Sequence, residues 1–295
     1  MSRTASPASN TPYGLARVCR VWQVARATIY RHRAPTGPQP RRRGPAGPMA
    51  DTDLVEEIRA VLAASPFHGE GHRKVWARLR VGGIRTSLRR VLRLMRENAL
   101  LAPSRVGAAR GPRNHDGTIV PETIDTMWGT DLTTTWTAEG QAAMFIAVDH
   151  MSAECIGIHA ARHATRFEAL EPLRQGVRAH FGGFAKGIAA GLLVRHDHGS
   201  QYMSAAFQDE LRFLGIESSP AFVRAPEGNG CAERFIRTLK ENLLWVQNFD
   251  TVEALRQALL AFKETYNSTC LIERHGFQTP AAVRAKQLPP AALAA

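Results

Sequence analysis

The segment APEGNGCAERFIRTLKEN, residues 225–242, joins a glycine-rich turn to the start of a helix with one acid followed by basic residues. Side chains four and seven positions apart share a helix face, so Glu233, Arg237 and Lys240 are expected on one side. The acid then has two cations just beyond it, directed at the same substrate. Which fold the chain adopts can be inferred from the positions of two other acids that could share a site with Glu233.

Two further acids stand in strand-like surroundings. Asp131 lies within WGTDLTTTW, and Asp197 follows the apolar run in LLVRHDHGSQY. Strand ends of α/β sheets open into a crevice, so the two carboxylates meet if their strands are neighbours. Glu233 then reaches the same place from a helix packed over that end of the sheet.

Three carboxylates without a counterion repel one another by roughly 4 kcal/mol per close pair at an effective dielectric of about 20. Such a cluster calls for divalent metal, and oxygen-only ligands suit Mg²⁺ or Mn²⁺. Two ions about 4 Å apart would clamp the attacking and leaving oxygens of a phosphodiester displacement. Arg237 and Lys240 would hold the phosphates in line. Spacing alone is weak evidence for this site, because the chain has 26 Asp and Glu.

The order of elements expected from residue 127 onward indicates an α/β domain. Three strands of a meander are expected first, then a helix, a buried strand, a helix and a short strand. Their ranges are 127–136, 141–149, 153–160, 166–180, 191–195, 204–213 and 216–219. The helix of Glu233 and a last helix, capped by Asp250 or Thr251, complete the domain. This order predicts a mixed five-stranded sheet flanked by helices.

Positive charge is concentrated before this domain. Residues 1–120 hold 22 Lys and Arg against 7 Asp and Glu, whereas the remaining 175 residues hold 16 against 19. A basic portion joined to a mildly acidic one suggests that the first portion meets a polyanion. All but one of these 22 basic residues are arginine. The arginine fork suits phosphates and guanine edges, so the expected partner is nucleic acid and not a membrane.

Residues 12–33 predict a helix-turn-helix whose second helix carries Arg26 and Arg31. The alternative is a basic helical hairpin that only packs. Residues 34–50 are rich in Pro, Gly and Arg and are expected to form a linker. Its triplet of arginines, residues 41–43, either follows the DNA backbone or is a solvated charge run.

A second helical unit is expected between residues 51 and 97. Its last helix has an apolar stripe and, on the opposite face, Arg89, Arg93 and Arg96. Arginines at this spacing suit the phosphates that line the major groove, and a solvated surface is the alternative. The linker-like residues 103–120 follow.

The expected organisation therefore has four parts. Residues 1–50 form a helix-turn-helix-like segment with its linker, 51–120 a second all-α DNA-binding unit, 121–248 the catalytic core and 249–295 a C-terminal helical extension. The four cysteines form no Cys-x-x-Cys pair, which argues against structural zinc and disulfides. The sequence shows no signal peptide and no membrane span, so a cytoplasmic protein is expected.

Four motifs, WGTDLTT, RHDHGSQYMS, PEGNGCAERFIRTLK and YNSTCLIERHGFQTPAA, closely resemble those of the retroviral-integrase-like DDE transposases of bacterial insertion sequences. The resemblance is narrower to the second-reading-frame type of the two-frame elements, and it covers nearly the whole chain. It implies a ribonuclease-H-like core in which Asp131, Asp197 and Glu233 bind the catalytic metals. It also assigns Lys240 to the basic position seven residues after the glutamate.

Two short runs depart from that family's pattern. They are RHDH around Asp197 and GCA before Glu233. Because these residues flank the acids, the departures put neighbouring DNA contacts in doubt and not the metal site.

The resemblance implies sequence-specific binding of element ends, metal-dependent 3′-end cleavage and strand transfer into target DNA. It further implies a circular intermediate, a homo-oligomer that bridges two DNA ends, and an upstream-frame protein of the same element as a possible partner. Two alternatives are an inactive DNA-binding regulator of the element and a ribonuclease-H-like nuclease without joining activity.

Several polar residues near the acids have competing interpretations. Asp149 is either a fourth acid of the site or, more often for a strand-end Asp, the start of a turn. His196 and His198 could bind metal, but a hard-oxygen site favours substrate contact or core hydrogen bonding for them. Asn229 either contributes to a phosphate cradle between two glycines or caps the helix of Glu233.

Overall fold

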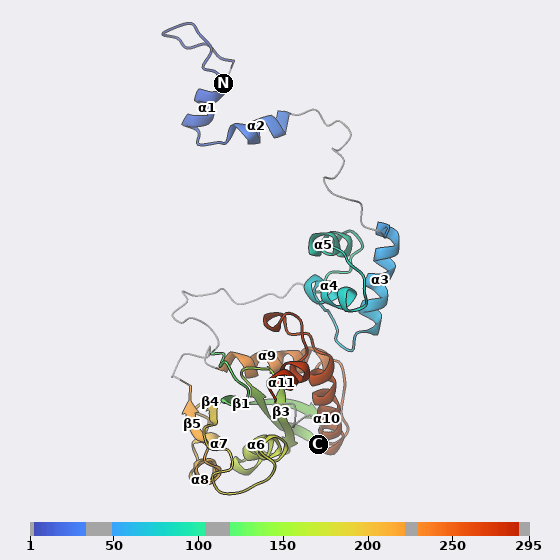
Figure 1. Cartoon of the computed structure of the whole chain (residues 1–295), viewed down its shortest axis with the longest axis vertical. Helices are drawn as coiled ribbons and strands as arrows, with labels where there is room; N and C mark the ends of the chain where they lie inside the picture. Colours follow the sequence, from blue (N-terminus) through green and yellow to red (C-terminus); the bar gives the residue numbers. More distant parts are fainter. Residues whose placement is uncertain (1–2, 34–48, 104–118, 222–228, 289–295) are drawn as a thin grey trace. The chain divides into compact units, whose positions relative to one another are not determined.

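The computed structural model describes residues 3–33, 49–103, 119–221 and 229–288 (Figure 1). The chain divides into two compact units, Met1–Pro48 and Met49–Ala295. Most of both expected linkers, and most of the glycine-rich turn before Glu233, lie outside the described residues. The arginine triplet at 41–43 also lies outside them.

The first unit contains the two expected helices, α1 (Leu15–Val21) and α2 (Arg26–Arg33), separated by four residues. Among its described residues the apolar side chain of Cys19 is buried, whereas that of Trp22 is 64% exposed. Two helices of seven and eight residues supply too little apolar surface to build a core. The hairpin is therefore a small element with most of its side chains in solvent.

Three helices begin the second unit: α3 (Asp51–Ala64), α4 (His72–Val81) and α5 (Leu88–Glu97). Ser87 caps α5, because its hydroxyl accepts a hydrogen bond from the backbone N–H of Arg90. The apolar stripe expected on α5 is present, with Val91, Leu94 and Met95 buried. The core of this bundle is formed by Leu54, Val55, Ile58, Val75, Leu79, Val91, Leu94 and Met95.

The five strands form one mixed sheet in the order β3-β2-β1-β4-β5. Their bounds are β1 Met127–Thr137, β2 Gly140–Asp149, β3 Cys155–Ala161, β4 Leu193–His196 and β5 Glu217–Pro220. The first three strands pair antiparallel, and β4 pairs parallel to both β1 and β5. The predicted mixed five-stranded sheet is thus confirmed.

Helices cover both faces of this sheet (Figure 1). One apolar core lies against α6 (Arg166–Phe181), α7 (Ser200–Met203) and α8 (Ala205–Leu214), and the other against α9 (Gly230–Leu239) and α10 (Val252–Thr269). Strand β2 alternates between the two cores, with Phe145 in the first and Ile146 in the second. A strand with both faces buried reads as the nearly continuous apolar run AAMFIAV.

Short elements complete the domain. The helix α9 continues directly into a π-helical turn, η2 (Lys240–Leu244). A 3₁₀ turn, η3 (Glu273–His275), and the helix α11 (Pro280–Gln287) follow α10. None of these was expected from the sequence, since each is too short to carry a periodic pattern.

A glycine allows α6 to lie directly on β3. A Cβ atom at Gly157 would stand 2.0 Å from the backbone oxygen of Pro172. Backbone of a helix cannot yield as a flexible side chain does, so the interlayer distance depends on this glycine.

We therefore expect Gly157→Ala to lower the free energy of unfolding by roughly 3 kcal/mol, the upper end of overpacking costs. Urea unfolding would measure it. Gly183→Ala is the matched control, because a Cβ there would meet its nearest neighbour at an ordinary 3.6 Å. Equal stability of the two variants would contradict the close approach.

Candidate active site

Asp131 and Asp197 lie on neighbouring parallel strands. In the register of β1 and β4, Gly129 pairs with Arg195. Asp131 lies two residues after Gly129, within β1. Asp197 lies two residues after Arg195, directly after the end of β4. Neighbouring strands are about 4.8 Å apart. The condition that these two strands be neighbours is met, and the two acids stand at nearly the same level.

Glu233 reaches this region from the first turn of α9. Trp128 and Leu132 of β1 contribute to the core beneath α6. Since successive side chains of a strand alternate, Asp131 faces the other side of the sheet, where α9 contacts β1. Glu233 is exposed, whereas Phe235 on the same helix is buried in the core. The helix thus anchors itself by its apolar face and leaves the acid accessible.

Asp131 is affected electrostatically by the other two acids. The pKa of Asp131 is raised to about 6, mainly by burial and further by the negative charges of Asp197 and Glu233. Lys240 and a hydrogen bond from the backbone N–H of Leu132 oppose this rise. Partial desolvation by the surrounding protein also raises the pKa of Glu233. Asp131 is therefore an acid whose charge is incompletely compensated by the protein.

The three acids do not form a compact set of metal ligands in this structure. One oxygen of Asp131 accepts a hydrogen bond from the N–H of Leu132 at 2.8 Å, and one oxygen of Asp197 from that of Gly199 at 2.7 Å. Among the described residues, no three His, Cys, Asp or Glu side chains gather closely enough to hold a metal ion. The available donors at this end of the sheet are carboxylate oxygens, which suit hard divalent cations.

Two cations were expected beyond Glu233. Lys240 is half-buried at the start of the π-helical turn, and its charge lowers the pKa of Asp131. Arg237 is exposed in the last turn of α9. Lys240 is thus within electrostatic range of the acids. A π-helical turn within a helix is frequent at functional sites.

The arginines expected to meet DNA from α5 differ in their surroundings. Arg89 and Arg96 are exposed. Arg93 instead forms ion pairs of 2.6 Å with Asp51 of α3 and with Glu97. Its guanidinium therefore stabilises the helical unit, a role that the spacing of basic residues did not reveal. In the first unit, Arg26 and Arg31 are exposed on α2.

Asp149 starts a turn, as the more common interpretation held. It is fully buried, and its carboxylate accepts hydrogen bonds from the N–H and hydroxyl of Ser152 and from the N–H of Asp125. These contacts occupy both of its oxygens. Asp149 is therefore a structural acid next to the site.

The remaining polar neighbours are also explained by local contacts. His196 is buried, contacts the hydroxyl of Ser218 at 2.8 Å and stacks on Tyr202, so its interpretation as a core residue is confirmed. His198 is exposed. Asn229 stands at the N-cap of α9, but the expectation that its side chain caps the helix is wrong. Its amide binds a strand instead.

Residues near the C-terminus clamp the domain, and sequence reasoning missed their roles. Arg284 of α11 is buried and forms ion pairs with Asp125, at 2.7 Å, and with Glu154. Arg274 donates to the backbone oxygen of His150 at 2.7 Å. A buried arginine has no periodic signature in the sequence, so no local pattern indicated these contacts.

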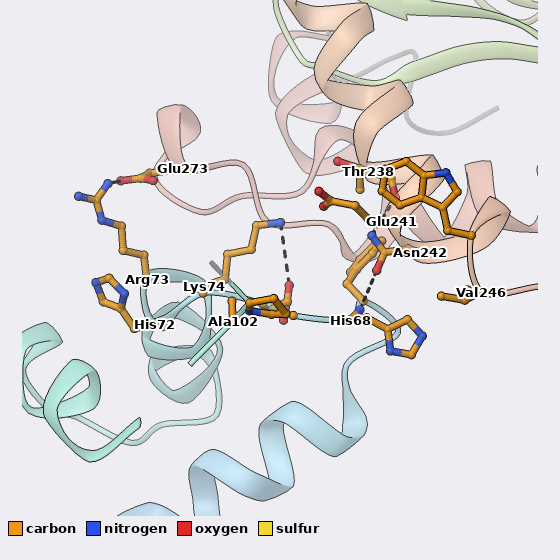
Figure 2. A pocket seen from close by; sticks show the side chains of 16 residues that line it. His68, His72, Arg73, Lys74, Ala102, Thr238, Glu241, Asn242, Val246 and Glu273 are labelled. Carbon is orange, nitrogen blue, oxygen red and sulfur yellow. Dashed lines mark hydrogen bonds and ion pairs between the residues drawn. The ribbon is translucent and has the colours of Figure 1, made fainter. Parts of the chain in front are cut away.

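Within the second unit, residues of the helical bundle and of the core together line a pocket of about 840 Å³ (Figure 2). The contacts across it are specific. Phe67 of the α3–α4 connection is buried in the apolar cluster of the core, and the N–H of His68 donates to Asn242 at 2.6 Å. Arg73 pairs with Glu273 at 2.6 Å. The bundle is thus attached to the same helical segment that carries Glu233.

Comparison with known proteins matches two family models. Residues 50–107 match an HTH-like domain, and residues 214–280 match an integrase core domain. The second range contains Glu233, whereas Asp131 and Asp197 precede it.

Individual relatives agree with these models. The transposase InsD of insertion element IS2A/D/F/H/I/K from Escherichia coli is 28% identical over 238 residues, covering 78% of this chain and 77% of the relative. InsD of IS2D from strain K12 matches to the same extent. Among solved structures, the simian T-cell lymphotropic virus intasome in complex with PP2A regulatory subunit B56 gamma aligns at 18% identity and a TM-score of 0.45, covering 82% of this chain and 77% of that one. The HTLV-2 integrase catalytic core domain in complex with magnesium aligns at 18% identity and a TM-score of 0.42. That alignment covers 57% of this chain and 99% of the HTLV-2 chain.

The integrase core and its relatives place this chain in the DDE polynucleotidyl transferase family. Within that family it is an insertion-sequence transposase of the second-reading-frame type, similar to InsD of IS2. No described helix is long and apolar enough to cross a membrane.

The raised pKa of Asp131 predicts a cost in stability. The unfolded chain loses this proton near pH 3.8 and the folded chain near pH 6, so ionised Asp131 destabilises the fold above that range. At 1.36 kcal/mol per pKa unit, Asp131→Asn should raise the free energy of unfolding by about 3 kcal/mol at pH 7.5 in EDTA. The gain should vanish at pH 3.5, where the acid is neutral in both states.

Urea unfolding at the two pH values would measure this difference. Asp209→Asn is the control, because Asp209 is exposed and forms a surface pair with Arg212. Its effect should stay within about 0.5 kcal/mol at either pH. An Asp131→Asn protein that is no more stable than wild type at pH 7.5 would show that Asp131 is not electrostatically strained.

Proposed function

We propose that Asp131, Asp197 and Glu233 are the metal ligands of this transposase, and that it cleaves the 3′ ends of its element and joins them to target DNA. The supporting observation is that the charges of Asp197 and Glu233 act on Asp131, whose pKa is raised to about 6 mainly by burial and further by these two acids. Separate elements that each direct an acid to one sheet end are costly unless a cation is bound.

The donor set fits two Mg²⁺ or Mn²⁺ ions. All three side chains supply carboxylate oxygens, and one oxygen of Asp131 and one of Asp197 already accept backbone hydrogen bonds that orient them. When bound, such ions activate a water or a DNA 3′-hydroxyl and stabilise the leaving oxygen. The protein contributes the fixed spacing of Asp131 and Asp197 and the accessible position of Glu233.

Positioning of the DNA falls to the basic residues of the same helix. Lys240 is within range of the acids, and Arg237 is exposed one turn before it. Both would hold backbone phosphates so that the attacking oxygen lies in line with the leaving oxygen.

End recognition is assigned to the helical units that precede the core. The helices of residues 51–97 would place Arg89 and Arg96 of α5 on DNA, and α2 would contribute Arg26 and Arg31. Residues 1–50, 51–120, 121–248 and 249–295 remain the proposed functional parts. The first two bind ends, the third performs the chemistry and the fourth supports it.

Strand transfer of two ends needs more than one active site in one complex, so a homo-oligomer on double-stranded DNA is part of the proposal. An upstream-frame protein of the same element is a further proposed partner, and the bacterial cytoplasm with its nucleoid is the proposed location. An inactive regulator would bind ends equally well in EDTA and never nick them. A nuclease without joining activity would cleave but fail to join a supplied 3′-hydroxyl end.

Asp131→Asn, Asp197→Asn and Glu233→Gln should each reduce strand transfer at least about 10³-fold, because each removes a ligand carboxylate. Binding to element ends should stay within about twofold of wild type. Gel-based joining assays in Mg²⁺ and end-binding titrations would measure the two activities. Glu217→Gln, an exposed acid of β5, is the control and should be fully active. Near wild-type joining by Glu233→Gln would refute the proposed site.

Arg89→Ala combined with Arg96→Ala should weaken end binding and reduce the salt slope of log K by about 0.9 for each lost phosphate contact. The melting temperature should not change, because both side chains are exposed. Arg93→Ala should instead lower the melting temperature, since it breaks the pair with Asp51. Unchanged affinity and salt slope in the double variant would remove α5 from the DNA interface.

A further inference from the structure

Asn229 stands one helical turn before Glu233 and links its helix to the strand of Asp131. Its side-chain Nδ2 donates a hydrogen bond of 3.0 Å to the backbone oxygen of Thr130, the residue that precedes Asp131. The asparagine is only 7% exposed and makes no capping bond to its own helix. Its amide is therefore used between α9 and β1.

The amide rests directly on the backbone of β1 at Gly129. A Cβ atom on Gly129 would lie 2.5 Å from the Oδ1 of Asn229 and 2.6 Å from the Nε2 of His150. Contacts this short do not occur, so any other residue at position 129 would displace both side chains. The missing side chain of Gly129 thus creates the space that Asn229 occupies.

His150 shares this space with Asn229. Burial lowers the pKa of His150, and its Nδ1 lies 3.0 Å from the backbone oxygen of Ile119, so the neutral ring donates there. Its Nε2 and the Oδ1 of Asn229 both lie over Gly129, and the interaction with Asn229 partly offsets the effect of burial on the pKa of His150.

The bond is made close to both acids. Asn229, the N-cap residue of α9, precedes Glu233 by four residues, and Thr130 directly precedes Asp131 on β1. The hydrogen bond from Asn229 to Thr130 therefore ties the start of the helix that carries Glu233 to the part of the strand that carries Asp131.

We propose that Asn229 is a positioning residue that sets Glu233 beside Asp131 at the distance that divalent metal requires. The inference rests on the proposed function, since it takes those two acids as ligands. In this inference Asn229 contacts neither metal nor DNA, and it affects metal binding only because it fixes the position of α9.

The test measures metal binding apart from activity. The full chain without DNA is titrated with MnCl₂, and the rise in melting temperature gives the half-maximal Mn²⁺ concentration. Asn229→Ala should raise this concentration roughly 10- to 100-fold, as losses of ligand-orienting partners do. Asn229→Asp, which keeps the shape but lacks the donor to Thr130, should also raise it and serves if the alanine variant does not fold.

Asn267→Ala is the matched control. Asn267 is as buried as Asn229 and also links a helix to a strand, through two hydrogen bonds of 2.9 Å to the backbone of Cys155. It is far from the three acids in the sequence, and its hydrogen bonds are made to a different strand from that of Asp131. It should lower the melting temperature and leave the Mn²⁺ concentration unchanged. If both Asn229 variants respond to Mn²⁺ within twofold of wild type, the positioning role is refuted. If wild type itself neither responds to Mn²⁺ nor joins DNA, the proposed function fails instead.

Discussion

The burial of one carboxylate, Asp131, within reach of the charges of two others is the constraint on which the account of this structure depends. Asp131 is kept partly buried on a central strand, where its pKa rises to about 6. Lys240 offsets part of that charge from the π-helical turn. A fold that holds such a group must gain its stability elsewhere.

That stability comes from regions on either side of the site. Two apolar cores sandwich the sheet, and Gly157 lets α6 approach β3 directly. The buried ion pairs of Arg284 tie the last helix to the start of β1 and to β3. Because these contacts fix β1 and its neighbours, Asp131 lies on a rigid strand and Asp197 directly follows another.

The sequence was informative where a pattern is periodic or a motif is specific. Alternating and continuous apolar runs located all five strands, and the strand before Asp197 is the neighbour of the strand of Asp131, as a meeting of the two acids required. It was uninformative where a contact joins distant residues. No local pattern shows that Arg93 pairs with Asp51, or that Asn229 binds β1 and does not cap α9. At both positions a contact with a residue distant in the sequence overrides the role that the local sequence favours.

The central claim is that the three acids together hold divalent metal. Anomalous diffraction from crystals of the full chain with an element-end DNA and Mn²⁺ would test it most directly. The account predicts two Mn²⁺ peaks about 4 Å apart, with carboxylate oxygens of Asp131, Asp197 and Glu233 as ligands at about 2.2 Å. Well-ordered DNA with no peak at these carboxylates, or with Mn²⁺ bound by other residues, would contradict it.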